Sequence, residues 1–162
     1  MAKGVNLDQR KGQITDIKGN IESKKGQLEN LTEQKKALLE AGTEVQGTGL
    51  DDRVIQTVMD SINQSLQDVE SKGSELSSEM NSDAQMLEEI REDTERDIES
   101  TEAERRSLEQ KKSLLDRFGL GASLDQGLSE LSTHSSELDS VKNEAIQAMQ
   151  ELSRVSSQLD GL

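Results

Sequence analysis

The sequence lacks cysteine, proline, tryptophan and tyrosine, and its 162 residues include one phenylalanine and one histidine. Without cysteine the chain forms no disulfide bond and has no thiolate chemistry. Compact domains obtain much of their buried area from aromatic side chains, so the near absence of aromatics argues against a thick globular core. The absence of proline together with 32% charged residues is typical of long helices in contact with solvent.

The residue patterns of common catalytic and metal sites are also missing. His134 is the one histidine, so no site with two imidazoles can form, and a position on a helix surface is expected for it. The glycine-rich stretches lack the Gly-Lys-Ser/Thr of a phosphate-binding loop, and no acidic calcium-binding loop is present. Carboxylate pairs such as Glu88/Glu89 and Asp97/Glu104 lie on a thin helix, where nothing desolvates them. We therefore predict a protein that is not an enzyme, with no catalytic, cofactor-binding or metal-binding residues and no cofactor.

The net charge of −14 is distributed unevenly along the chain. Residues 1–41 carry eight basic and six acidic side chains, whereas residues 42–162 carry eleven basic and 27 acidic ones. Nucleic acid is therefore not an expected partner, because phosphate binding needs a concentrated basic face. Residues 75–102 hold eleven acids and two arginines. This acidic stretch is interpreted either as a solvated helix face or as a docking surface for a basic partner.

The first residues, Met1-Ala2-Lys3-Gly4-Val5-Asn6, lack the apolar run of a signal peptide. No stretch of the sequence approaches the length and apolar character of a membrane span. We expect a cytoplasmic protein without a membrane span, and leaderless export is the open alternative.

A seven-residue repeat of apolar positions dominates residues 51–118. It predicts one very long helix 2, about 51–118, whose a and d positions keep the same register from end to end. A narrow apolar stripe of this kind is not stable alone in water, so the helix requires partner helices. The a row is Met59, Leu66, Gly73, Met80, Leu87, Thr94, Thr101, Leu108 and Leu115, and the d row is Ile55, Ile62, Val69, Leu76, Asp83, Ile90, Asp97, Glu104, Lys111 and Phe118.

A similar repeat predicts helix 1 over about 6–41, with Asn6 as its cap. Its a row is Leu7, Ile14, Ile21 and Leu28, and its d row includes Ile17, Leu31 and Leu38. Arg10, Lys24 and Lys35 interrupt the stripe, and we expect their charged ends to reach outward to solvent. The glycines of Gly42–Gly49 predict a loop over 42–50. Thr48, near the end of this loop, and Asp51 are expected to mark the start of helix 2.

The second turn is predicted over 119–122, because Gly119 follows the last apolar residue of helix 2. Ser123 and Gln126 form a capping-box pattern, so helix 3 is predicted over about 123–160. Its a row is Leu124, Leu131, Leu138, Ala145, Leu152 and Leu159, and its companion row is Val141, Ala148, Val155 and Leu162.

The lengths of the three segments predict an all-α fold. Helices 1 and 3 together roughly equal helix 2, so each is expected to fold back on one half of it. The prediction is a single elongated helical domain over residues 1–162: an antiparallel coiled coil in which two hairpins share the long central helix. The competing arrangement is a compact bundle with helices 1 and 3 side by side, and it would require helix 2 to break near Gly73 or in residues 91–107.

The stripe itself is the main indication of function. Apolar residues beside it in helix 2, namely Val54, Val58 and Ile98, either widen the internal core or form a face for other helices. The first hypothesis is therefore a helical adaptor or assembly protein that binds another helical protein. The second is a self-assembling coiled-coil rod or scaffold whose partner is a further copy of the chain, and in either case we expect a homo- or hetero-oligomer. A third is an acidic decoy that occupies a nucleic-acid-binding site on another protein.

The Leu7–Leu38 arm, the Gly42–Gly49 turn and the helix that follows resemble the small helical WXG100-like and LXG-associated accessory proteins of type VII secretion. The sequence departs from that family in lacking the Trp-x-Gly turn and the Tyr-x-x-x-Asp/Glu export signal, since it has no tryptophan or tyrosine. The resemblance implies co-folding with the helical domain of a larger secreted or toxin-like partner, and a role as a bacterial secretion accessory protein.

Overall fold

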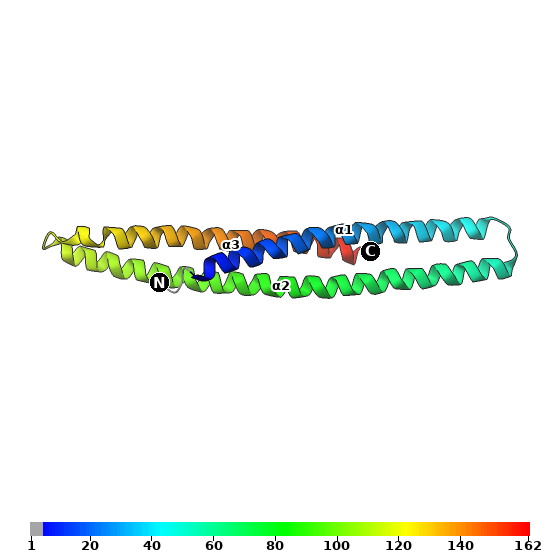
Figure 1. Cartoon of the computed structure of the whole chain (residues 1–162), viewed down its shortest axis with the longest axis horizontal. Coiled ribbons are helices and arrows are strands. Elements are labelled where there is room, and N and C mark those ends of the chain that lie inside the picture. The colour runs from blue at the N-terminus through cyan, green and yellow to red at the C-terminus, as the bar shows by residue number, and fades with distance from the viewer. Residues whose placement is uncertain (1–4) are drawn as a thin grey trace. The chain divides into compact units, whose positions relative to one another are not determined.

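The computed structural model describes residues 5–162 and contains three long helices. They are α1 (Val5–Gly47), α2 (Asp52–Asp116) and α3 (Asp125–Asp160), and a short 3-10 helix, η2 (Gly121–Leu124), precedes α3. Figure 1 shows the long helices and the two connections between them. The described residues form no β-strand, so the predicted all-α fold is confirmed. The predicted cap at Asn6 concerns a side chain outside the described part of the chain.

The first connection is shorter than the predicted 42–50 loop. The prediction is wrong at its start, because α1 continues through Gly42 to Gly47. Gly42 is buried, and a Cβ atom there would lie 3.6 Å from Cε of Met59. Packing of this position against α2 therefore outweighs the low helix propensity of glycine. Gly49, with φ of 68°, supplies the left-handed backbone that reverses the chain.

Helix α2 is capped differently from the prediction. The hydroxyl of Thr48 donates a hydrogen bond of 2.8 Å to the carbonyl of Val45, so it belongs to the end of α1. The side chain of Asp51 instead accepts a hydrogen bond of 3.2 Å from the backbone N–H of Arg53. Asp51 is thus the residue that caps α2.

The second connection also departs from the predicted capping box. The hydroxyl of Ser123 donates to the carbonyl of Leu120 at 2.7 Å, within η2 and its cap, and α3 begins at Asp125. Gly119 has φ of 72°, which confirms its role in the turn. Gly121 is buried, and a Cβ atom there would overlap with the carboxylate of Asp116. The turn therefore needs glycine at 119 for its backbone conformation, whereas a larger residue at 121 would require the side chain of Asp116 to move.

The chain packs as two compact units, and each contains a segment of all three helices. The first unit comprises residues up to 18 together with 84–150, and the second comprises residues 19–83 together with 151–162. In the first unit, Lys112–Asp125 and Glu95–Lys142 ion pairs show that α3 runs antiparallel to α2.

In the second unit α1 folds back on α2 in the same antiparallel sense. Gly42 lies against Met59, and Lys24 lies against Asp83. The prediction that both outer helices fold back on one central helix is thus confirmed.

We expected that α1 and α3 could pack at the same place only if α2 broke, and this expectation is wrong. In the first unit Arg10 of α1 contacts Asp97 of α2, and Lys142 of α3 contacts Glu95 only two residues away. Helix α2 nevertheless continues unbroken through Gly73 and residues 91–107. Three helices therefore pack together where the outer two meet, without interruption of the central one.

The buried residues follow the predicted rows over most of the chain. The a row of helix 1 is confirmed from Leu7 to Leu28, and the rows of helix 3 are confirmed from Leu131 onward, with alternating steps of three and four residues from Leu138 to Leu159. The buried apolar residues are Leu7, Ile14, Ile17, Ile21, Leu28, Leu31, Ile62, Val69, Leu76, Met80, Leu87, Ile90, Leu131, Leu138, Val141, Ala145, Ala148, Leu152, Val155 and Leu159.

The prediction of one unshifted register in α2 is wrong beyond Ile90. The predicted d positions there become exposed, as at Glu104 and Lys111, while Ile98 becomes half-buried. The buried positions then step by four twice in succession, from Ile90 to Thr94 to Ile98, which is the stutter pattern of coiled coils. The shift has a chemical reason, because it partly buries the side chain of Ile98 where the old register would bury the carboxylate of Asp97.

Candidate functional site

The basic residues on the stripe of α1 do not extend outward as expected. Lys24 is 7% exposed, and its ammonium forms a hydrogen-bonded ion pair with the carboxylate of Asp83, which is also 7% exposed. The predicted outward orientation is wrong because α2 offers a buried counter-charge at the facing position of the seam. A buried charge requires such a partner, since desolvation otherwise costs several kcal/mol.

A second basic residue of α1 forms a similar pair in the first unit. Nη1 of Arg10 lies 2.6 Å from Oδ2 of Asp97 and 3.4 Å from the hydroxyl of Thr94. The Thr94 hydroxyl itself donates to the carbonyl of Ile90 at 2.6 Å. Asp97 keeps this position although the buried row has moved away from it, because its carboxylate pairs with an arginine.

The two ion pairs have matching spacing on the two helices. Arg10 and Lys24 are two heptads apart on α1, and Asp83 and Asp97 are two heptads apart on α2. Because the helices are antiparallel, one register satisfies both pairs. A slip of one heptad in either direction would place the buried charges of Lys24 and Asp83 opposite apolar residues, at a cost of several kcal/mol. The pairs therefore specify the register of α1 on α2, which the apolar rows alone specify weakly.

The third basic residue of the stripe contacts the end of α3. The ammonium of Lys35 donates a hydrogen bond to the backbone carbonyl of Leu162 in the second unit. Lysine near a helix C-terminus also interacts favourably with the helix dipole. All three charges that interrupt the α1 stripe therefore make specific contacts within the chain.

The acidic stretch 75–102 is largely occupied by internal ion pairs. Six of its eleven carboxylates contact a basic group of the same chain: Asp83, Glu88, Asp93, Glu95, Asp97 and Glu102. Of these carboxylates, three pair with another helix and three pair only with an arginine of α2 itself.

Arg91 is the centre of a network that joins α2 to α3. Its Nε lies 3.1 Å from Glu88, its Nη1 lies 2.7 Å from Glu95, and Lys142 of α3 reaches the same Glu95 oxygen at 3.3 Å. The hydrogen bond from Arg91 lowers the pKa of Glu88, and the Glu88 carboxylate raises the pKa of Arg91.

Opposing effects act on the third member of this network. Desolvation raises the pKa of Glu95, but hydrogen bonds from Lys142 and Arg91 outweigh it and lower the pKa below 4.5. These shifts come from ion pairs and not from isolation of a reactive group.

His134 lies closer to the seam than expected for a surface residue. It is half-buried, seven residues before Val141, and its Nε2 is shielded from solvent without a hydrogen-bond partner. Thr101 Oγ1 and Arg105 Nε of the same unit are likewise shielded and have no hydrogen-bond partner, although Arg105 Nε lies 3.8 Å from a carboxylate oxygen of Glu109. Across residues 5–162 no three histidine, cysteine, aspartate or glutamate side chains gather as metal ligands.

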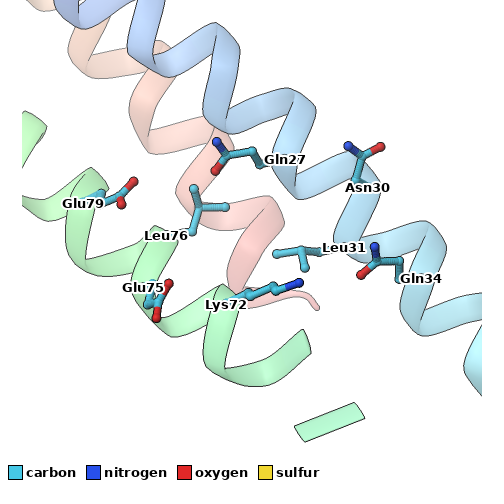
Figure 2. A pocket seen from close by; sticks show the side chains of 8 residues that line it. All are labelled: Gln27, Asn30, Leu31, Gln34, Lys72, Glu75, Leu76 and Glu79. Atoms are coloured by element: carbon cyan, nitrogen blue, oxygen red, sulfur yellow. The ribbon is translucent and has the colours of Figure 1, made fainter. Parts of the chain in front are cut away.

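A groove between α1 and α2 in the second unit has polar rims and an apolar floor. Its volume is about 360 Å³, with Leu31 and Leu76 at the centre of the lining in Figure 2. The rims are Gln27, Asn30 and Gln34 on α1, and Lys72, Glu75 and Glu79 on α2. Figure 2 shows Lys72 extending from α2 towards the side chains of α1.

A larger groove in the same unit lies where α3 ends. Its volume is about 730 Å³, and its lining includes Leu159 of α3 and Leu162 just beyond it, together with Leu39 and Leu66 of the other two helices. A third helix fills the α1–α2 seam at Gly73, where Leu159 lies 3.7 Å from the position of a Cβ atom, but among residues 5–162 no third helix covers the groove next to it. Side chains such as Leu66 consequently stay only half-buried.

The two connections expose apolar side chains that the sequence pattern does not reveal as exposed. Near the α1–α2 loop, Leu39, Leu50 and Val54 are 53%, 48% and 47% exposed. At the α2–α3 turn, Leu114, Phe118 and Leu120 are 57%, 77% and 57% exposed. The placement of Phe118 in the d row is therefore wrong. The charged d positions before it, Glu104 and Lys111, are the signal that the row had already left the core. Of the three residues expected to widen the stripe, only Val58 and Ile98 are half-buried, and Val54 is exposed.

The chain matches no protein-family model, no curated protein and no solved structure. Among the described residues, no helix is both long enough and apolar enough to cross a membrane.

Proposed function

We propose that the protein is a helical adaptor or assembly protein that acts by packing its helices against a helix of another protein. The observation that carries this proposal is the groove of about 730 Å³ at the end of α3. Leu159 of α3 covers the seam at Gly73, and within residues 5–162 no third helix covers the neighbouring apolar positions such as Leu39 and Leu66. A partner's amphipathic helix that continued the path of α3 would bury them, as helices commonly do in an apolar groove.

The proposal includes a non-enzymatic role. Acid–base catalysis uses ionisable groups whose pKa values are shifted by burial or by confinement with like charges. In this chain the shifted groups Glu88, Glu95 and Lys112 are each paired with an opposite charge. Such pairs favour a structural use of the charges.

The resemblance to type VII accessory proteins extends the proposal to a particular partner. On this view the partner helix belongs to a larger secreted or toxin-like protein, with which the chain co-folds before export. The chain would then be a cytoplasmic accessory protein, or one that leaves the cell without a cleaved leader.

Site-specific photo-crosslinking in the cells that make the protein tests the proposal. A photoreactive amino acid at Asn63, which lines the large groove, is compared with the same amino acid at Asn20, which is exposed on α1 away from it. A crosslink to a different protein at Asn63 and none at Asn20 would support the adaptor. Equal labelling at the two positions, or none at Asn63, would refute the groove as a docking site.

A self-assembling structural protein is the second candidate function, and a separate observation favours it. Both connections between helices expose large apolar side chains, and such exposure marks interaction sites when the residues are grouped. A crosslink between two copies of the chain would support this candidate over the adaptor.

A further inference from the structure

The two connections carry opposite charges. We define the acidic turn as residues 39–54, which hold four acidic side chains and one basic one. We define the basic turn as residues 105–120, which hold five basic side chains and two acidic ones. The acidic turn lies in the second unit and the basic turn in the first. The basic turn is unusual in a chain whose net charge is −14.

Each turn also combines its charge with uncovered apolar surface. Leu39, Leu50 and Val54 belong to the acidic turn, and Leu114, Phe118 and Leu120 belong to the basic turn. Phe118 is the one aromatic residue of the chain, and at 77% exposure it is the most exposed of these six side chains. Aromatic residues are enriched at the buried centres of protein interfaces, so its exposure at a turn points to an interface.

The charges of both turns are available for intermolecular contact. Within residues 5–162, Glu40 and Glu44 of the acidic turn are exposed and take part in no ion pair. Lys111 and Arg117 of the basic turn are likewise exposed and form no ion pair in that part of the chain. These four groups can thus be changed without breaking an ion pair of the folded chain.

We propose that the basic turn of one copy docks on the acidic turn of a second copy, with Phe118 as the apolar centre of the contact. This inference rests on the proposed assembly function and specifies a second copy of the chain as the occupant. Charge complementarity selects that occupant, because each turn carries the charge that the other attracts. An anionic membrane surface would match the basic turn alone and would leave the acidic turn and its three apolar residues unused.

A contact of this kind joins two different surfaces, so it is heterologous. Each copy keeps one free acidic turn and one free basic turn, and further copies add until the assembly closes into a ring or grows as an open chain. The same geometry makes the contact sensitive to salt, since the charges are solvent-exposed and are screened within about 8 Å at physiological ionic strength.

The test is a charge exchange between turns, measured by light-scattering mass over a concentration series of the whole chain. One variant carries Lys111→Glu and Arg117→Glu, so that both of its turns are acidic. The other carries Glu40→Lys and Glu44→Lys, so that both of its turns are basic. The mean mass of the wild type should rise at least twofold as the protein concentration increases from about 10 µM to about 1 mM, the range of weak protein association. Each variant alone should stay monomeric, and an equimolar mixture of the two should regain the increase.

Two controls separate a specific contact from a general effect of charge. Glu22→Lys with Glu29→Lys makes the same charge change on exposed positions of α1, and it should assemble as the wild type does. Phe118→Ser removes the apolar centre without changing the charge, and it should lose the concentration-dependent mass. Circular dichroism establishes that each variant keeps the helix content of the wild type.

Three outcomes would overturn the proposal: a wild type that stays monomeric throughout, a mixture of variants that fails to regain mass, or a variant that assembles alone. Binding of the monomeric wild type to phosphatidylserine vesicles, lost in Phe118→Ser, would assign the basic turn to a membrane surface instead. The failure of this proposal is distinguishable from failure of the proposed function, because a crosslink from Asn63 to a different protein would support the adaptor whether or not the chain assembles with itself.

Discussion

Replacement of Lys24 by methionine should destabilise the protein strongly, because it leaves the carboxylate of Asp83 buried without its counter-charge. Both side chains are only about one-tenth exposed, at 9% and 10%. Breaking a buried ion pair on one side typically costs about 3–5 kcal/mol. The thin bundle lets water reach the orphaned carboxylate after a small side-chain movement, so we expect a loss of about 3 kcal/mol, at the lower end of that range.

The double variant Lys24→Met with Asp83→Leu should recover most of this loss. Two apolar side chains in place of a buried ion pair are often neutral or stabilising by about 1–4 kcal/mol, because the desolvation penalty disappears. The free energy of unfolding of the double variant should therefore be within about 1 kcal/mol of the wild-type value, or higher than it. The single variant Asp83→Leu should lose about as much as Lys24→Met.

Urea unfolding followed by circular dichroism at the helix band measures these free energies, since the chain has no tryptophan or tyrosine for fluorescence. Equal m-values across the four proteins would show that the comparison concerns stability alone. The exposed pair Arg96–Asp93, at 71% and 50% exposure, is the matched control, and Arg96→Met should cost less than about 1 kcal/mol. A cost below that limit for Lys24→Met, or additive losses in the double variant, would refute the reasoning.

Three further predictions concern the turn, the α2–α3 network and the seam. Gly121→Ala should destabilise by about 1–3 kcal/mol through overlap with a neighbouring carboxylate, whereas Gly12→Ala, with no atom within 4 Å of the new Cβ, should stabilise by up to about 1 kcal/mol in thermal unfolding. The pKa of Glu95 is lowered in the folded chain, so the ionised carboxylate stabilises the fold above about pH 4.5, and this stabilisation is lost as the pH falls through the folded-state pKa. Glu95→Gln should therefore weaken the acid-induced fall in melting temperature, and an unchanged pH profile of the melting temperature would contradict this. Thr101→Val should stabilise by about 1 kcal/mol in urea unfolding, because the Thr101 hydroxyl is buried without a partner, and a loss of stability would show that the hydroxyl is satisfied in solution.

The sequence was sufficient to predict the helices and most of the core, because both depend on a local period. Leu7 to Leu28 and Leu138 to Leu159 recur every seven residues, and burial follows those rows. Helix ends were predicted less well. Gly42 reads as a loop residue by propensity, but it packs against Met59, which is distant in sequence and was not visible in the local pattern.

The candidate functional features depended on long-range pairing and could not be predicted from one segment at a time. Lys24 alone suggests a side chain that reaches to solvent, and Asp83 alone suggests a weak point in the stripe. Their matched spacing with Arg10 and Asp97 was present in the sequence, and comparison of polar positions between the two antiparallel rows would have revealed it. Phe118 is exposed because α2 ends at Asp116, before the last predicted d position, and heptad counting from one origin does not detect that end.

The central claim is that paired charges set the register in which the helices pack, and one distance measurement tests it most directly. The chain has no cysteine, so Asp16→Cys and Glu92→Cys, both exposed in the first unit, accept spin labels without competing sites. Double electron–electron resonance should give one narrow distance distribution in the otherwise wild-type chain. Replacement of Arg10, Lys24, Asp83 and Asp97 by leucine should add populations displaced by a heptad, about 10 Å along the helix. The same narrow distribution in both proteins would contradict the account.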